Sequence, residues 1–92
     1  MLNVVRGNKF NKSIKKYKNK KKELQEFYKV IDFLIDEKEI PKKYEDHELK
    51  GNMKGIRELH LGFDDLLLYF IRSEENELIL VDIGTHSHTL KK

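Results

Sequence analysis

The sequence predicts an α+β fold, in which an N-terminal strand and a helical hairpin pack on one face of a mainly antiparallel sheet with a C-terminal three-strand meander. Two observations support this prediction. Apolar residues recur at helical spacing through residues 10–35, and three apolar segments separated by short polar turns follow residue 55. Because 92 residues suffice for one hydrophobic core, we treat residues 1–92 as a single domain.

The N-terminal half predicts a strand followed by two helices. Apolar residues at positions 2, 4 and 5 indicate a short strand that Gly7 closes. Phe10, Ile14 and Tyr17 follow the i, i+4, i+7 spacing of one helical stripe. A second helix is expected over about 21–36, ending before Pro41. Its broader apolar stripe consists of Leu24, Phe27, Tyr28, Ile31, Leu34 and Ile35.

The C-terminal half predicts three consecutive strands, over residues 56–61, 66–72 and 77–85. The connections at 62–65 and 73–76 are short and polar, which favours an antiparallel meander. The helical hairpin would cover one face of this sheet. The opposite face would then be free for a ligand, and we expect the functional site there.

Composition indicates a cytoplasmic protein without disulfides. The chain contains no cysteine, which excludes disulfides and thiolate metal sites. Its first ten residues lack the apolar segment of a signal peptide. The longest apolar run, residues 66–71, is too short to span a bilayer. We therefore expect a cytoplasmic location.

Positive charge is concentrated at the N-terminal end. Residues 1–22 contain nine Lys or Arg and no acidic residue, whereas the remaining seventy contain ten basic and sixteen acidic side chains. This pattern is consistent with a solvated lysine-rich helix. It is equally consistent with binding of ribosomal RNA, mRNA or an acidic partner protein.

All four histidines lie after residue 46, at predicted strand ends and loops. They are His47, His60, His86 and His88, and Asp64 occupies the turn just beyond His60. An imidazole titrates near neutrality, so it can act as base in one step and acid in another. RNA cleavage without a metal needs such a pair, one for the ribose 2′-OH and one for the leaving 5′-oxygen.

Cations and alternative chemistries complete the residue inventory. Lys50, Lys54 and Arg57 flank the histidines and could bind the RNA phosphate. A rival interpretation is a zinc site, in which His86 and His88 share one face of an extended segment and His47 or His60 completes the ligands. No HExxH pattern, glycine-rich phosphate loop, GxSxG motif or cysteine nucleophile is present.

Several short motifs, in a fixed order, resemble the YafQ-type mRNA interferases of the RelE/ParE toxin superfamily. The motifs are Tyr44-x-Asp46-His47-x-Leu49-x-Gly51, Lys54-Gly55-x-Arg57-Glu58-x-His60-x-x-x-Asp64, Leu67-Leu68-Tyr69 and Gly84-Thr85-His86-Ser87. The strand–helix–helix order of the N-terminal half is similar as well.

The resemblance implies the toxin of a type II toxin–antitoxin system, with a RelE-like fold. Such toxins enter the ribosomal A site, cleave mRNA there without a cofactor and so inhibit translation. The implied partners are an antitoxin protein, mRNA and the ribosome. The positions matching the family's catalytic residues are His47, His60, Asp64 and His86. His86 is then the general acid, while His47 and His60 orient the phosphate or take the 2′-proton, assisted by Asp64.

Leu90 departs from the family pattern. The family commonly has phenylalanine four residues after the last catalytic histidine, where a ring can stack on a base. Leu90 could contact RNA without stacking, and Phe63 or Tyr69 could supply the ring instead. The alternative hypothesis is a weak or inactive relative that retains antitoxin or RNA binding.

Overall fold

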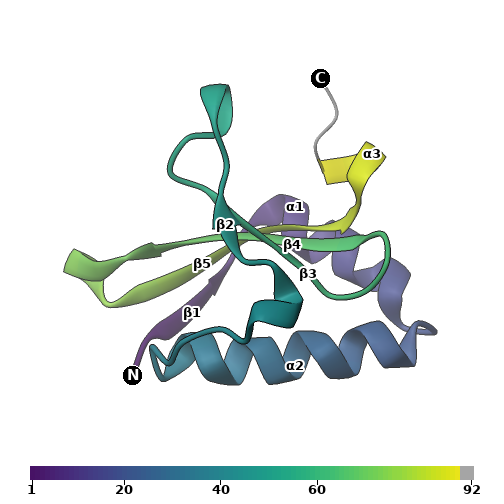
Figure 1. Cartoon of the computed structure of the whole chain (residues 1–92), viewed down its shortest axis with the longest axis horizontal. Helices are drawn as coiled ribbons and strands as arrows, with labels where there is room; N and C mark the ends of the chain where they lie inside the picture. Colours follow the sequence, from purple (N-terminus) through teal and green to yellow (C-terminus); the bar gives the residue numbers. More distant parts are fainter. Residues whose placement is uncertain (90–92) are drawn as a thin grey trace.

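A five-stranded sheet forms the centre of the molecule, with the strand order β1-β5-β4-β3-β2 (Figure 1). The computed structural model describes residues 1–89. Strands β3 (Arg57–His60), β4 (Asp65–Arg72) and β5 (Glu77–Thr85) form the predicted antiparallel meander. Strand β1 (Asn3–Arg6) pairs in parallel with β5, and the two-residue β2 (His47–Glu48) forms the far edge. The predicted α+β fold is confirmed, and β2 is an addition to it.

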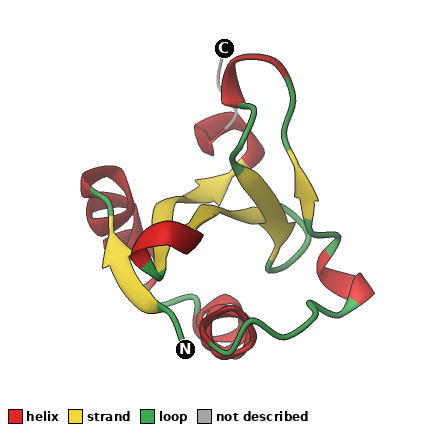
Figure 2. Cartoon of the chain, turned by 90° about the vertical axis from the view of Figure 1, so that its left-hand side faces the viewer, coloured by secondary structure: helices red, strands yellow, loops and turns green. Residues whose placement is uncertain are grey.

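Two helices form the predicted hairpin. Helix α1 (Asn8–Ile14) continues into a 3₁₀ turn (Lys15–Tyr17), and α2 (Lys21–Ile35) then crosses below the sheet (Figure 2). The rings of Phe10 and Phe27 stack with their centroids 5.6 Å apart, which joins the two helices. Among the residues described, no helix is both long and apolar enough to cross a membrane.

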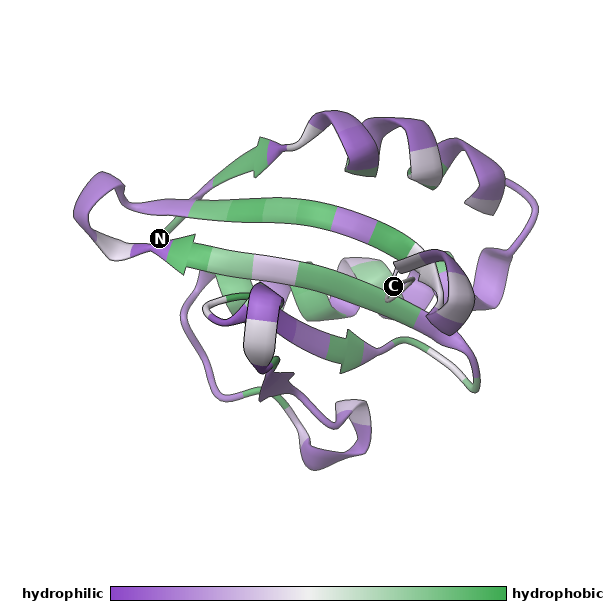
Figure 3. Cartoon of the chain, turned by 90° about the horizontal axis from the view of Figure 1, so that it is seen from above, coloured by the Kyte–Doolittle hydropathy of each residue, from purple (hydrophilic) through white to green (hydrophobic). Residues whose placement is uncertain are grey.

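The hydrophobic core lies between this hairpin and the sheet. Alternation along the strands directs one set of side chains toward α2, and β4 and β5 are the most apolar ribbons in Figure 3. The core cluster includes Phe10, Tyr17, Phe27, Val30, Leu34, Leu59, Leu67, Tyr69, Leu78, Leu80 and Ile83. Most of the apolar positions predicted from the helical and strand periodicities therefore meet in one cluster.

Close backbone contacts fix both ends of the hairpin. The Leu2 amide donates to the Ile35 carbonyl at 2.8 Å, so the start of the chain satisfies the end of α2. The Gly7 amide donates to the Leu80 carbonyl at 2.9 Å, and a Cβ at Gly7 would lie 3.0 Å from that oxygen. Glycine therefore allows the chain to turn from β1 into α1 against β5.

Two segments project from the sheet on the side opposite α2. One is the loop between β2 and β3, which contains a 3₁₀ turn (Gly51–Met53), and the other is the short helix α3 (His86–Thr89) (Figure 1). Thr85 caps α3, because its hydroxyl accepts the His88 amide at 3.4 Å. These projections stand on either side of the sheet face on which we expected the site.

Candidate active site

The alternation of β3 places two functional side chains on the face opposite the core. Leu59 is fully buried in the core cluster, so its neighbours Glu58 and His60 point to the other face. They lie beside Leu68 and Leu66 of β4 in the antiparallel register. Both leucines are buried, so the site has an apolar floor.

Glu58 lies between two imidazoles. Its Oε1 is 3.4 Å from Nε2 of His47 and 3.4 Å from Nε2 of His60. The carboxylate is only 4% exposed, and its Oε2 has no hydrogen-bond partner among the described residues. Such burial favours a carboxylate that hydrogen bonds to at least one protonated imidazole nitrogen.

The tautomer of His47 follows from its second contact. Nδ1 of His47 lies 2.7 Å from the backbone carbonyl of Glu45, and a carbonyl oxygen only accepts, so Nδ1 carries the proton. A neutral His47 would then turn a lone pair toward Glu58, and a protonated one would turn an N–H toward it.

Asp64 holds His86 in one orientation. Nδ1 of His86 donates to Oδ1 of Asp64 at 2.6 Å, and the His86 amide approaches the same oxygen at 3.3 Å. These hydrogen bonds lower the pKa of Asp64 below its ordinary value of 3.8, so the carboxylate is ionised at neutral pH. Because Nδ1 carries a proton, Nε2 of His86 is left to accept or release one.

These pairs form one group, which we call the histidine cluster: His47, Glu58, His60, Asp64 and His86. The ring centroids of His60 and His86 lie 5.6 Å apart, with the rings at 69° to each other. This contact joins the Glu58 group to the Asp64–His86 pair. Three of its members, Glu58, His60 and His86, each offer one possible metal-ligand atom, and these three atoms lie within 4.8 Å of one another. Two imidazoles and a carboxylate are suitable ligands for zinc or copper after a small inward movement.

His88 lies outside this cluster. Its Nε2 is 3.0 Å from Oγ of Ser13 and 3.2 Å from Oδ2 of the buried Asp82. The segment is a helical turn rather than an extended strand, so His86 and His88 point in different directions. The rival zinc site that pairs His86 with His88 is therefore wrong, and Glu58 takes the place assigned to His88.

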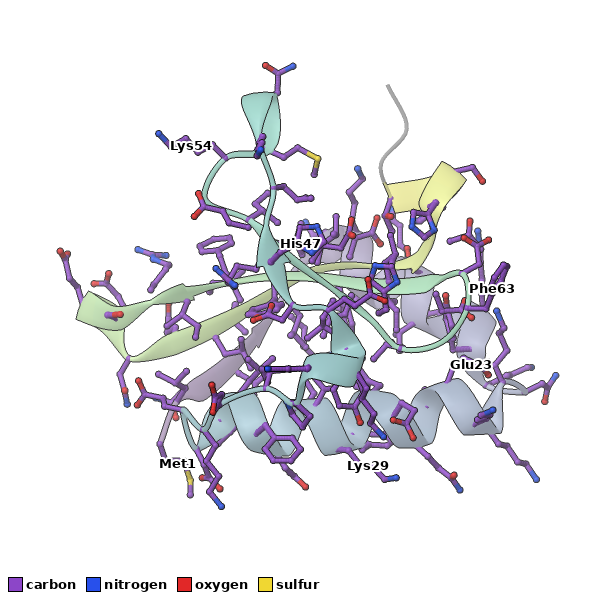
Figure 4. The ribbon with its side chains drawn as sticks, viewed as in Figure 1. Met1, Glu23, Lys29, His47, Lys54 and Phe63 are labelled. Atoms are coloured by element: carbon purple, nitrogen blue, oxygen red, sulfur yellow. The ribbon has the colours of Figure 1, made fainter. Side chains whose placement is uncertain are left out.

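The predicted phosphate-binding residues are divided. Lys50 and Lys54 are exposed in the β2–β3 loop, and Figure 4 shows Lys54 near the end of this projection with His47 at its base. Arg57 lies on the other face of β3 from Glu58, and its guanidinium contacts the Asp46 carboxylate at 3.2–3.3 Å. The structure therefore does not bring Arg57 into the histidine cluster.

The candidates for base stacking are also separated. Leu90 lies outside the described residues. Tyr69 is buried and its hydroxyl hydrogen bonds to Asp46, so its ring belongs to the core. Phe63, next to Asp64, is fully exposed at the end of the β3–β4 turn (Figure 4).

The sequence analysis assigned no role to Glu58, although a signal for it existed. Glu58 and His60 are separated by two positions in a predicted strand, so they had to share a face. That signal could have added Glu58 to the histidines.

Comparisons with known proteins identify the family of this chain. The family model described as "Bacterial toxin of type II toxin-antitoxin system, YafQ" matches residues 2–91. A Haemophilus influenzae protein that carries the name YafQ is 35% identical over 65 residues, which span 68% of this chain and 64% of that protein. The chain thus aligns with just under two thirds of that relative's length.

Two solved structures have a similar fold over nearly their whole length. A metal-bound toxin from Helicobacter pylori has a TM-score of 0.87 and 42% identity, covering 97% of this chain and 99% of the toxin. YafQ in the Escherichia coli DinJ–YafQ toxin–antitoxin complex has a TM-score of 0.82 and 25% identity, covering 96% of both chains. The chain belongs to the YafQ family of bacterial toxins of type II toxin–antitoxin systems.

Proposed function

We propose that this toxin is a ribosome-dependent endoribonuclease that cleaves mRNA by general acid–base catalysis without a metal ion. One observation carries the proposal. Asp64 fixes His86 through Nδ1, which leaves Nε2 available beside His60. An imidazole oriented by a carboxylate is a common arrangement for proton transfer at neutral pH.

The proposed reaction needs two proton transfers and no added reactant. The ribose 2′-OH loses its proton, and its oxygen attacks the adjacent phosphorus. The bond from phosphorus to the 5′-oxygen then breaks, which yields a 2′,3′-cyclic phosphate and a 5′-hydroxyl. His86, protonated at Nε2, supplies the proton to the leaving 5′-oxygen, while Asp64 stabilises the imidazolium before transfer.

The other half of the cluster would accept the 2′-proton. Glu58 contacts His47 and His60 through the same oxygen, so either imidazole can act with the carboxylate behind it. The imidazole that takes the proton gains a charge-assisted hydrogen bond to Glu58. Lys50 and Lys54 would contribute positive charge near the phosphorane from the β2–β3 loop.

The basic N-terminal region supports the proposed partners. All nine Lys and Arg side chains of residues 1–22 are exposed. Lys20 forms an ion pair with Asp65 at 2.9 Å, and the other eight form none within residues 1–89, so their positive charge is available at the surface. We propose that it binds ribosomal RNA during cleavage and an acidic segment of the antitoxin in the inhibited complex, within the cytoplasm. The two ligands would then compete.

Substitution of His86 tests the proposed acid. His86→Gln cannot transfer a proton, so cleavage of mRNA on programmed ribosomes should fall by about 10²–10⁴-fold. Ser87→Ala alters an exposed neighbour in the same turn and should cleave normally. Full activity of His86→Gln would refute the role of His86. Absent cleavage by the unaltered protein, with antitoxin or RNA binding intact, would instead favour an inactive relative.

A metal ion would compete with this chemistry. Glu58, His60 and His86 could hold a zinc or copper ion, and the similar Helicobacter pylori toxin is described as metal-bound. A bound ion would act as a Lewis acid, but it would occupy the imidazole lone pairs that proton transfer requires. We therefore propose that such a metal inhibits cleavage.

A further inference from the structure

We propose that Phe63 stacks on a nucleobase of the mRNA substrate, and that the groove beside it holds the attached ribose-phosphate chain. This inference rests on the proposed RNA cleavage, for which it supplies a substrate-binding subsite. It assigns the base-stacking role to the β3–β4 turn.

Phe63 is the most exposed large apolar side chain of residues 1–89. Its relative exposure is 101%, compared with 63% for Tyr28 and no more than 39% for the exposed aliphatic residues after Met1. The β3–β4 turn nevertheless has a defined shape, because the Leu61 amide donates to the Asp65 carbonyl at 2.7 Å. The turn therefore presents the ring to solvent, where one face can receive a planar ligand.

The position of Phe63 ties the ring to the proposed chemistry. Asp64, the next residue, holds His86 at 2.6 Å, and His60 precedes the same turn. A base stacked on Phe63 therefore belongs to a nucleotide close to the scissile phosphate. Tyr69, the alternative ring, is 1% exposed and donates to Asp46, so it cannot stack on RNA.

A groove leads from this ring around the β3 edge to the helical side of the molecule. Its volume is about 530 Å³, which lies within the range of small-molecule sites. His60 and Phe63 line it together with Lys22 of α2 and with Lys43 and Tyr44 of the 3₁₀ turn before β2. Because His60 belongs to both the groove and the histidine cluster, one RNA strand can occupy both.

The charge of the groove suits a phosphate chain. Lys22 is exposed and forms no ion pair with any residue in 1–89, so its ammonium is available to an anion. Lys43 lies 3.7 Å from Glu26, but the Glu26 carboxylate also accepts a 2.6 Å hydrogen bond from Tyr44 and contacts Lys29. The Glu26 charge is thus largely compensated within the protein, and Glu45 is the other acid in the lining. An aromatic ring beside basic side chains is typical of single-strand binding.

Binding to programmed ribosomes tests the inference independently of cleavage. The probe is mRNA whose A-site codon carries 2′-O-methyl riboses, which prevent attack by the 2′-oxygen. Loss of one stacked base should weaken binding of Phe63→Ala by about 5- to 150-fold, and Phe63→Trp should bind at least as well as the unaltered protein. Tyr28→Ala, at an exposed aromatic outside the groove lining, should bind normally.

Abasic probes identify the stacked nucleotide. Removing the base that stacks on Phe63 should weaken probe binding by the unaltered protein as much as the Phe63→Ala substitution does. The same abasic probe should bind Phe63→Ala no more weakly than the intact probe does. Lys43→Ala, outside the basic N-terminal region, should reduce the slope of log affinity against log salt by about 0.7.

Three outcomes would overturn the inference. In the first, Phe63→Ala binds the probe normally. In the second, Phe63→Ala weakens binding of the intact and the abasic probe equally. In the third, Phe63→Ala loses antitoxin binding while its binding to the probe is unchanged. A different result is that the unaltered protein fails to cleave unmodified mRNA while Phe63→Ala and the abasic probes still give the expected losses of binding. That result would refute the proposed ribonuclease and leave the RNA-binding subsite in place.

Discussion

Replacing Glu58 by glutamine separates the stability of the domain from its proposed activity. The carboxylate is 4% exposed, contacts two imidazoles at 3.4 Å through one oxygen, and leaves the other oxygen without a partner among the described residues. Glutamine has nearly the same shape. Its amide can donate to the neutral form of His47 or His60, so the contact is kept while the buried charge is removed.

The size of the effect follows from the unsatisfied oxygen. An unsatisfied buried polar group costs about 1–3 kcal/mol, and more when it is charged. Glutamine leaves a neutral carbonyl at that position, so part of the cost remains. We therefore expect the free energy of unfolding to rise by about 1 kcal/mol. For a domain of this size, this corresponds to a melting temperature roughly 4–8 °C higher. Cleavage should fall by about 100-fold or more, because a neutral amide cannot stabilise an imidazolium.

Thermal unfolding followed by circular dichroism, together with cleavage on programmed ribosomes, measures both quantities. Glu74→Gln removes an exposed carboxylate in the β4–β5 turn and should change neither. A lower melting temperature of Glu58→Gln would mean that the imidazoles already compensate the charge fully. Unchanged cleavage would refute the proposed role of Glu58 in proton transfer.

Three further predictions concern the helix contacts, α3 and metal binding. Tyr44 is buried and donates a hydrogen bond to Glu26, and both effects raise its pKa to about 12. The protonated hydroxyl therefore stabilises the fold fully below pH 10, and this contribution is lost as the pH rises from 10 to 12. Tyr44→Phe should lower the melting temperature and make alkaline unfolding less steep; an identical pH profile would contradict this. A Cβ at Gly84 would lie 2.5 Å from the His88 ring, so Gly84→Ala should displace α3 and reduce cleavage, whereas unchanged NMR shifts of His86 would count against it. Micromolar zinc or copper should inhibit cleavage and EDTA should leave it unchanged; inhibition by EDTA would show that the reaction needs a metal.

The larger elements were predictable because each has enough residues to show a period. Helix α2 has fifteen residues and strand β5 has nine, and both were predicted to within about one residue of their ends. Strand β2 has two residues and α3 has four, which is too short for either periodicity to be visible. The turn into α3 had one local signal, the capping residue Thr85, which the sequence analysis did not use.

The candidate site was less accessible to sequence reasoning. Asp64 and His86 are separated by 22 positions, and only the sheet register brings them to 2.6 Å. The resemblance to a family grouped them, but it did not indicate that Asp64 contacts His86 rather than His60. Periodicity likewise could not show that Arg57 is directed to Asp46, because that contact depends on the path of the irregular segment before β2.

The parallel pairing of β1 with β5 has a consequence for the order of synthesis. The first strand to leave the ribosome has no neighbour in the sheet until residues 77–80, its partners in β5, have been added. Ser13 likewise meets His88 across 75 positions, just beyond His86 in the chain. The sheet and the histidine cluster can therefore form only after residues 77–86 have been synthesised, so the proposed activity cannot precede the synthesis of β5 and His86.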